Sequence, residues 1–278
     1  MTRCIDSIED LQDFVNNYKD IAFVPTMGNL HKGHLQLIKR ARSLSKNILV
    51  SIFINPTQFN SKKDFDNYPR TIKKDKLFLK ETYPECVIFS PKAKDILSIG
   101  HTDQYKISKL ANDLCGKYRP GHFAGVINII NILFQLISPR FAIFGKKDYQ
   151  QLIIINEFSK KYYPKINIIS QDIIRDKNYL ALSSRNSLLK NDFKLKANEL
   201  YLALKKLTEI IKLRNDYKAS EKEITSLLAN ADWDVEYISV RRQGDLKHAT
   251  LSDKRLIVLG AAKLNNIRLI DNIEFCID

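Results

Sequence analysis

Short apolar runs alternate with longer amphipathic segments over the first part of the chain, and this alternation is the feature that most limits its fold. The run at 47–54 is almost continuously apolar, which is typical of a parallel strand that is covered on both faces. We predict strands at 21–24, 47–54, 87–89, 141–144 and 166–169, with helices between them that include 7–18, 122–137 and 148–162. This order predicts the α/β class, with a Rossmann-like, doubly wound parallel sheet.

The pattern changes after residue 175. A long charged helix is predicted at 192–213 and a second helix at 219–231, followed by short strands at 235–241, 256–259 and 267–270. We therefore expect two domains: a Rossmann-like domain at 1–175 and a smaller α+β domain at 176–278.

Composition excludes several classes of protein. No run approaches the ~18 uncharged apolar residues of a membrane span, and residues 1–6 lack the apolar core of a signal peptide. The four cysteines are scattered and fit reduced thiols, so we expect a cytoplasmic protein. The net charge is +14, but the lysines are spread along the whole chain. We therefore expect no nucleic-acid partner, although a basic field would attract anionic substrates.

The segment Pro25–His34 follows the first predicted strand and precedes a helix. A turn with two glycines, Gly28 and Gly33, followed by the N-terminus of a helix is typical of a phosphate-binding site. The imidazoles of His31 and His34 could hydrogen-bond phosphate oxygens and stabilise charge that develops during transfer. The alternative is that both histidines are solvated or belong to a metal site.

Two further segments have the same character. Gly145–Gln151 is again a strand end, a turn and a helix start, in which Asp148 is a candidate N-cap and Lys147 could reach phosphates. Leu182–Asn186 places two hydroxyls and a guanidinium after a short apolar run, a set that suits a triphosphate. Each segment taken alone is also compatible with an ordinary charged connection.

Two other segments are weaker on their own. Asn55 and Gln58 follow the second predicted strand and offer neutral donors and acceptors, but the Asn-Pro pair also fits a plain turn with a solvated Gln58. In 119–126, His122 is favoured as a structural residue, and Arg119 either faces substrate or supports the loop. Because ligands bind beyond the carboxyl ends of parallel strands, we expect the segments that follow strands to converge.

Six motifs occur in one order: PTMGxLHxGH, NPxQF, YPRT, RPGHFxGV, FGxKDYQQL and SSRN. Together they resemble the pantothenate synthetases (pantoate–β-alanine ligases) of the H-x-G-H nucleotidyltransferase superfamily, over residues 23 to 186 and again at 267–272. The resemblance implies an AMP-forming ligase that condenses pantoate with β-alanine through pantoyl adenylate and releases pyrophosphate. ATP would be the substrate that brings Mg²⁺, pantoate would bind in the first domain, and a homodimer with a lid-like C-terminal domain is implied.

The resemblance also implies the site residues. The catalytic set would be His34, His31, Lys147 and Arg185. Pantoate would bind Gln58 and Gln151, with Gln58 also near β-alanine. No metal ligand is assigned, although Asp75 is a weak candidate for Mg²⁺. The residues implied for ATP are Met27, Gly28, Asn29, Leu30, His31, Lys32, Gly33, His34, Gly145, Lys146, Lys147, Asp148, Ile174, Leu182, Ser183, Ser184 and Arg185.

Some positions depart from the family pattern. Asn29 stands where Ala is common, Thr57 replaces the usual Met or Leu, and Lys32 and Lys146 are unusual. Two alternatives stay open: another H-x-G-H adenylyltransferase, which would not explain NPxQF with KDYQQL, and a tRNA-aminoacylating enzyme, which would need a domain with clustered basic residues. Neither GxGxxG nor GxxxxGK[ST] occurs, so dinucleotide and P-loop sites are not supported.

Overall fold

The computed structural model describes residues 2–100, 105–214 and 216–277. The chain divides into two compact units. Unit 1 comprises Met1–Lys146 and Ile154–Asp172, and unit 2 comprises Lys147–Ile153 and Ile173–Asp278. The short segment Lys147–Ile153 groups with unit 2 although it precedes the rest of that unit in the chain. The expected two-domain boundary after residue 175 stays a prediction.

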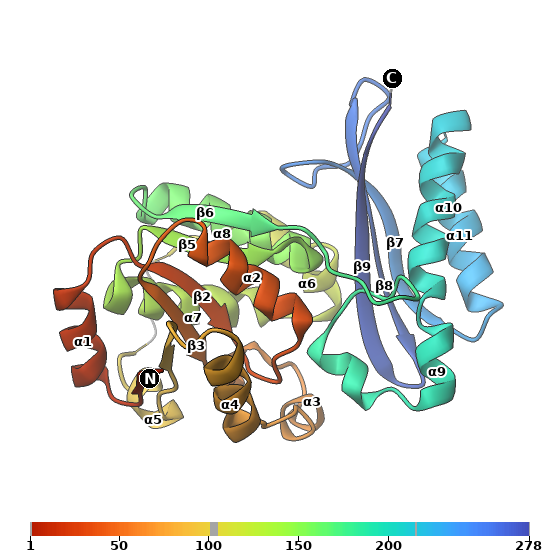
Figure 1. Cartoon of the computed structure of the whole chain (residues 1–278). Coiled ribbons are helices and arrows are strands. Elements are labelled where there is room, and N and C mark those ends of the chain that lie inside the picture. Colours follow the sequence, from red (N-terminus) through yellow and green to blue (C-terminus); the bar gives the residue numbers. More distant parts are fainter. Residues whose placement is uncertain (1, 101–104, 215, 278) are drawn as a thin grey trace. The chain divides into compact units, whose positions relative to one another are not determined.

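Unit 1 contains a six-stranded sheet in the order β1-β4-β3-β2-β5-β6, and each neighbouring pair is parallel (Figure 1). From β2 the order runs outward through β3 and β4 on one side and through β5 and β6 on the other, as in a doubly wound sheet, and β1 pairs with β4 at the edge. The predicted parallel α/β fold is therefore confirmed. The strands are β1 (Cys4–Ile5), β2 (Ala22–Thr26), β3 (Ile48–Ile52), β4 (Val87–Phe89), β5 (Phe141–Gly145) and β6 (Asn167–Gln171).

Both faces of this sheet are buried over its central strands β2 and β3. Val24 and Val50 pack with Ile38 of α2 on one face, whereas the alternate residues Phe23 and Leu49 are equally inaccessible on the other. This explains the almost continuously apolar strands. The helices of the first 162 residues are α1 (Ile8–Asn17), α2 (Lys32–Arg42), α3 (Lys62–Asp66), α4 (Ile72–Thr82), α5 (Ala93–Leu97), α6 (Cys115–Tyr118), α7 (His122–Ile137) and α8 (Tyr149–Tyr162), with short 3₁₀ turns η1 (Pro56–Gln58), η2 (Lys109–Asn112) and η3 (Lys146–Asp148).

Unit 2 contains an antiparallel sheet of β7 (Asp234–Arg242), β8 (Arg255–Leu264) and β9 (Ile267–Cys276). Its helical elements are η4 (Ser184–Leu188), α9 (Asn191–Lys196), α10 (Glu199–Leu213) and α11 (Tyr217–Ala229). The single helix expected at 192–213 is wrong, because α9 ends at Lys196 and α10 begins at Glu199. β8 is longer than the predicted 256–259, because the strand continues through Gly260 to Leu264. A Cβ atom on Gly260 would lie 3.1 Å from Leu200 Cδ1 of α10.

A two-residue turn joins β8 to β9. Leu264 pairs with Ile267, and the residues between them, Asn265 and Asn266, have φ of +48° and +63°. Positive φ at both central residues is typical of a type I′ hairpin, and asparagine tolerates it well. The turn thus sets the register in which β9 runs back along β8.

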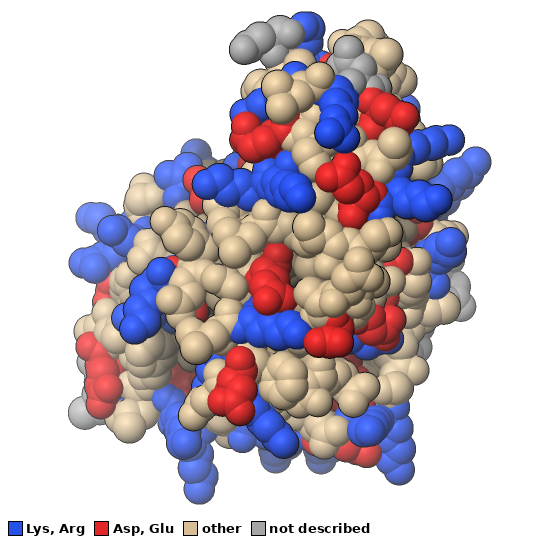
Figure 2. Space-filling view, turned by 90° about the vertical axis from the view of Figure 1, so that its right-hand side faces the viewer, with Lys and Arg blue, Asp and Glu red and all other residues tan. Residues whose placement is uncertain are grey.

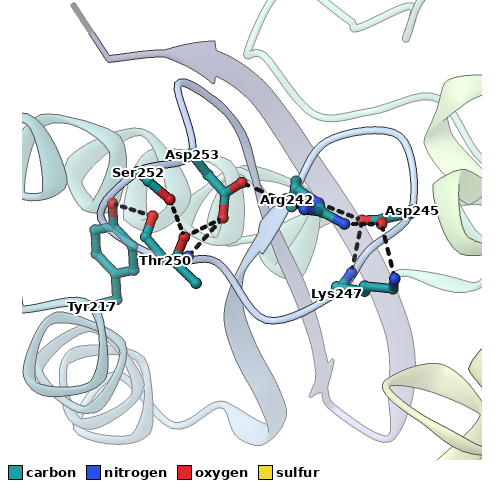
Figure 3. A network of polar contacts seen from close by, with 7 residues as sticks. All are labelled: Tyr217, Arg242, Asp245, Lys247, Thr250, Ser252 and Asp253. Atoms are coloured by element: carbon teal, nitrogen blue, oxygen red, sulfur yellow. Dashed lines mark hydrogen bonds and ion pairs between the residues drawn. The ribbon is translucent and has the colours of Figure 1, made fainter.

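The connection between β7 and β8 is held by its own polar network (Figure 3). Arg242 pairs with Asp245, and Thr250 donates to Asp253 from both its backbone N–H and its hydroxyl, each at 2.8 Å. The Arg242 hydrogen bond lowers the pKa of Asp245, and the Thr250 N–H lowers the pKa of Asp253. Arg242, Asp245 and Asp253 are partly exposed, so these contacts shape the loop more than they stabilise the unit.

Charge is mixed on the surface. On the face drawn in Figure 2, lysine and arginine side chains are interspersed with aspartate and glutamate rather than gathered in one patch. In the part of the chain that the structure describes, no helix is both long enough and apolar enough to cross a membrane.

Candidate active site

The connection from β2 to α2, residues Met27–His34, is called the histidine turn below. Its backbone is left-handed at two consecutive residues, with φ of +77° at Gly28 and +49° at Asn29. A Cβ atom on Gly28 would lie 3.0 Å from Asp75 Oδ2 and 3.1 Å from Ile52 Cγ2. Glycine is therefore required at 28 for conformation and for space. Asparagine adopts this region at lower cost than alanine, which accounts for Asn29.

Asp75 of α4 braces the histidine turn. Its side chain is buried, and the residue is 3% exposed. It accepts hydrogen bonds from the backbone N–H groups of Asn29 at 2.9 Å and Leu30 at 2.8 Å, and from the Thr71 hydroxyl at 3.0 Å. Both carboxylate oxygens thus bind groups of the protein. The structure therefore shows that Asp75 braces the turn, and its weakly indicated contact with Mg²⁺ stays a prediction.

His31 and His34 cap the start of α2 with their Nδ1 atoms. His31 Nδ1 accepts from the Gly33 N–H at 3.1 Å, and His34 Nδ1 accepts from the His31 N–H at 3.2 Å. The N–H groups of Gly33 and His34 are therefore both bonded within the turn, that of His34 to His31 O at 2.8 Å. Because Nδ1 must keep its lone pair to accept, the neutral rings are assigned a hydrogen on Nε2.

The histidine turn lies against the NPxQF segment. Gln58 is 8% exposed and Asn55 is 1% exposed. Asn55 Nδ2 donates to Gln58 Oε1 at 3.3 Å and to Gly125 O at 3.0 Å, while Gln58 Nε2 contacts Met27 Sδ. The interpretation of Gln58 as a solvated turn residue is therefore wrong. The structure brings this candidate pantoate residue beside Met27, a candidate ATP residue.

Helix α7 holds the NPxQF segment in place. A Cβ atom on Gly125 would lie 2.4 Å from Thr57 O, so only glycine permits this approach. His122 Nδ1 lies 2.7 Å from Gln58 O, and Arg119 Nη2 donates to the same carbonyl at 3.3 Å. Arg119 Nη1 also lies 3.0 Å from His122 Nε2. His122 is thus a supporting residue, as the sequence favoured, and Arg119 supports the same loop.

In unit 2, the segment Lys147–Ile153 is fastened to β9. Asn272 Nδ2 donates to Lys147 O at 3.1 Å, and the Tyr149 hydroxyl donates to Glu274 Oε1 at 3.2 Å. Asp148 is exposed and Gln151 is half-buried. Gln150 is buried at 3% exposure, which is typical of a packed residue rather than of one open to a ligand.

The segment 174–185 is also fastened to β9. Arg175 donates to Asp271 through both terminal nitrogens, at 2.6 Å and 2.9 Å, and its guanidinium lies 4.1 Å from the ring centre of Tyr201. Leu182 N–H bonds to Ile174 O at 2.8 Å, which joins two candidate ATP residues. Ser183 Oγ caps η4 by accepting from the Arg185 N–H at 3.2 Å.

Lys146 pairs with Asp172 at 2.8 Å, so its ammonium has a carboxylate partner in the protein.

The candidate residues fall into two groups, one in each unit. Unit 1 carries Met27–His34, Gln58, Gly145 and Lys146, and unit 2 carries Lys147, Asp148, Gln151, Ile174 and Leu182–Arg185. Sequence reasoning missed the supporting roles of Asp75, Asp271 and Asn272; the only signal for the last two was their place in the C-terminal motif.

A parallel sheet with a histidine-capped turn after an interior strand is typical of an α/β enzyme that binds its ligand beyond the carboxyl ends of the strands. Residues 3–274 match the family described as pantoate–β-alanine ligase. The chain belongs to the pantoate–β-alanine ligase family.

Individual relatives agree over the full length. The chain is 41% identical to the pantothenate synthetase of Methylobacillus flagellatus over 274 residues, 98% of each chain, and 41% identical to that of Neisseria meningitidis serogroup A over 272 residues, 97% of this chain and 98% of the relative. Its structure matches the pantothenate synthetase of Thermus thermophilus with a TM-score of 0.90 at 30% identity, covering 98% and 99% of the two chains. The Francisella tularensis ligase, solved with β-γ ATP and β-alanine, matches with a TM-score of 0.79 at 32% identity, covering 98% and 97%.

Proposed function

We propose that this ligase, which forms pantothenate from ATP, pantoate and β-alanine, works in two steps. In the first, a pantoate carboxylate oxygen attacks the α-phosphorus, and the bond to the bridging oxygen breaks. Pyrophosphate leaves with that electron pair, and pantoyl adenylate forms. In the second, the β-alanine nitrogen attacks the acyl carbon, AMP leaves, and the nitrogen loses a proton as the amide forms.

The observation that carries this proposal is the pair of histidine caps. Each ring uses Nδ1 to accept a backbone N–H, so the hydrogen on Nε2 is the ring's donor toward phosphate oxygens. A proton on Nδ1 would break the cap, and two charged rings with centroids 4.1 Å apart would repel each other. We infer that the neutral rings of His31 and His34 stabilise transition-state charge by donating hydrogen bonds from Nε2, and that neither ring transfers a proton.

The remaining residues orient the substrates. Gln58, whose amide is held by Asn55, would bind pantoate and lie near β-alanine, and Gln151 would also bind pantoate. Lys147 and Arg185 would neutralise the phosphates. This division suits adenylyl transfer, which depends on positioning and on neutralising spread negative charge.

Mg²⁺ would arrive with ATP. Among the described residues, no group of three or more histidine, cysteine, aspartate or glutamate side chains could hold a metal ion, and Asp75 is committed to the histidine turn. We infer that phosphate oxygens and water would supply most of its ligands. We also propose a homodimer that works in the cytoplasm, which light scattering of the purified protein and cell fractionation would test.

The test is ATP–pyrophosphate exchange in the purified protein without β-alanine. Exchange that requires pantoate supports the adenylate half-reaction. Pantothenate formation from all three substrates without any such exchange would overturn the two-step course. Exchange with another acid instead of pantoate would overturn the assigned substrate and direct attention to Thr57.

A further inference from the structure

The last strand, β9, contacts the segment that carries Lys147 at two points. Asn272 donates to Lys147 O at 3.1 Å, and Glu274 accepts from the Tyr149 hydroxyl at 3.2 Å. Asn272 and Glu274 are two residues apart on a strand and therefore face the same side of the sheet, and Lys147 and Tyr149 are likewise two residues apart. Two matched contacts fix both the position and the direction of this segment.

Asn272 is itself held firmly. The residue is 4% exposed, and its backbone N–H donates to Asp271 Oδ1 at 2.8 Å. Arg175 pairs with Asp271 and also reaches Asn272 O at 3.4 Å. Because Asn272 is buried and its backbone is hydrogen-bonded, its side chain has little conformational freedom. Its hydrogen bond therefore fixes the Lys147 backbone relative to β9.

Lys147 needs such support because of where it lies. It belongs to η3, a three-residue 3₁₀ turn between β5 and α8, and its own backbone is not part of a long helix or strand. Turns of this type have poorer hydrogen bonds than α-helices.

We propose that Asn272 is a positioning residue for the adenylation step, and that it acts by holding the backbone of Lys147. The inference rests on the proposed role of Lys147 as a phosphate-binding cation. Asn272 would not touch substrate. Its loss would affect the step in which the triphosphate is present more than the step in which β-alanine attacks the adenylate.

The experiment is a double-mutant cycle between Asn272→Ala and Lys147→Ala. Pantoate-dependent ATP–pyrophosphate exchange gives kcat and KM for ATP, and supplied pantoyl adenylate with β-alanine gives the second step. We expect Asn272→Ala to lower kcat/KM for ATP about 10-fold in the wild-type background and less than about 2-fold beside Lys147→Ala. The rate of the second step should stay within about 3-fold.

Arg268→Ala is the matched control. Arg268 lies on the same strand and also loses a side-chain contact on substitution, its 2.8 Å bond to Glu236, but that contact is directed to β7 rather than to Lys147–Ile153. We expect it to lower the Tm without changing the KM for ATP. Additive effects in the cycle, or equal losses in both half-reactions, would overturn the inference. If Asn272→Ala does not fold, Asn272→Ser enters the same cycle.

The outcomes separate the inference from the function. Absence of pantoate-dependent exchange in the unsubstituted protein would contradict the two-step function itself. Normal exchange in the unsubstituted protein together with normal exchange in Asn272→Ala would contradict only the role of Asn272.

Discussion

The histidine turn of unit 1 and the ATP segments of unit 2 are held by different means. The histidine turn is braced by a buried carboxylate, Asp75, and by caps formed from its own histidines. The segments at 147–149 and 174–185 are held by side chains of one strand, β9, chiefly Asp271 and Asn272. The first arrangement concentrates support in the turn and one neighbour, whereas the second makes two separate segments depend on the placement of a single strand.

The largest effect is expected at His34, where Nδ1 caps the helix and Nε2 is the proposed donor to phosphate. His34→Asn keeps an acceptor near the position of Nδ1 but removes the Nε2–H donor, whereas His34→Gln keeps a donor near Nε2 and removes the cap. We expect His34→Asn to lower the adenylation rate by about 10²–10³ with little change in ATP binding. Exchange kinetics and ATP titration measure this.

His34→Gln should retain more adenylation activity than His34→Asn while losing about 1 kcal/mol of stability through the cap. The reverse order of activities would show that the cap, and not the donor, is what adenylation requires.

The next effect concerns the brace. Asp75→Ala removes the acceptor of two backbone N–H groups, and we expect it to lower the free energy of unfolding by about 3 kcal/mol, since two partly buried donors are left unbonded. Urea denaturation measures this. Thr71→Val removes only the third donor and serves as the control, with an expected loss of about 1 kcal/mol. Similar losses for the two variants would contradict the bracing role.

A smaller effect is expected where α7 meets the NPxQF segment. Gly125→Ala would put Cβ 2.4 Å from Thr57 O, so the backbone must shift, at a cost of about 2 kcal/mol. Because the shift moves Gln58, the KM for pantoate should rise more than the KM for ATP. Ala124→Ser, on the exposed side of α7, is the control and should leave both values unchanged. Equal increases in both KM values would argue against Gln58 as a pantoate residue.

The smallest effect is at Asn29. Its φ of +49° favours asparagine or glycine, so we expect Asn29→Ala to cost about 1 kcal/mol and Asn29→Gly to be neutral or slightly stabilising. Thermal unfolding distinguishes the two. A more stable Asn29→Ala would mean that the turn relaxes out of the left-handed region when it is substituted.

The sequence was most informative where a segment's neighbours are local or its apolar pattern is simple. The parallel sheet followed from apolar strands, and α7 begins at His122 and ends at Ile137 as predicted. The motifs after β2, β3 and β5 were found from their positions at strand ends. β1 was missed because two residues, Cys4 and Ile5, carry no pattern.

The sequence was least informative about support from distant residues. Asp75 lies 46 positions from Asn29, and Gly125 lies 70 positions from Asn55, so neither contact could be predicted from spacing. The alternative of a solvated Gln58 stayed open for the same reason, because the contacts of its loop with α7 come from residues distant in the sequence. The break between α9 and α10 was missed because the charged periodic pattern continues through it.

The Asn265–Asn266 turn has a consequence beyond the hairpin it closes. Since side chains alternate along β9, its register decides that Asn272 meets Lys147 while Asp271 meets Arg175. Adding or deleting one residue in the turn would exchange these two side chains between the faces of the sheet. The number of residues in this turn therefore determines which side chains of β9 hold Lys147 and Arg175, two residues that are far from the turn in the sequence.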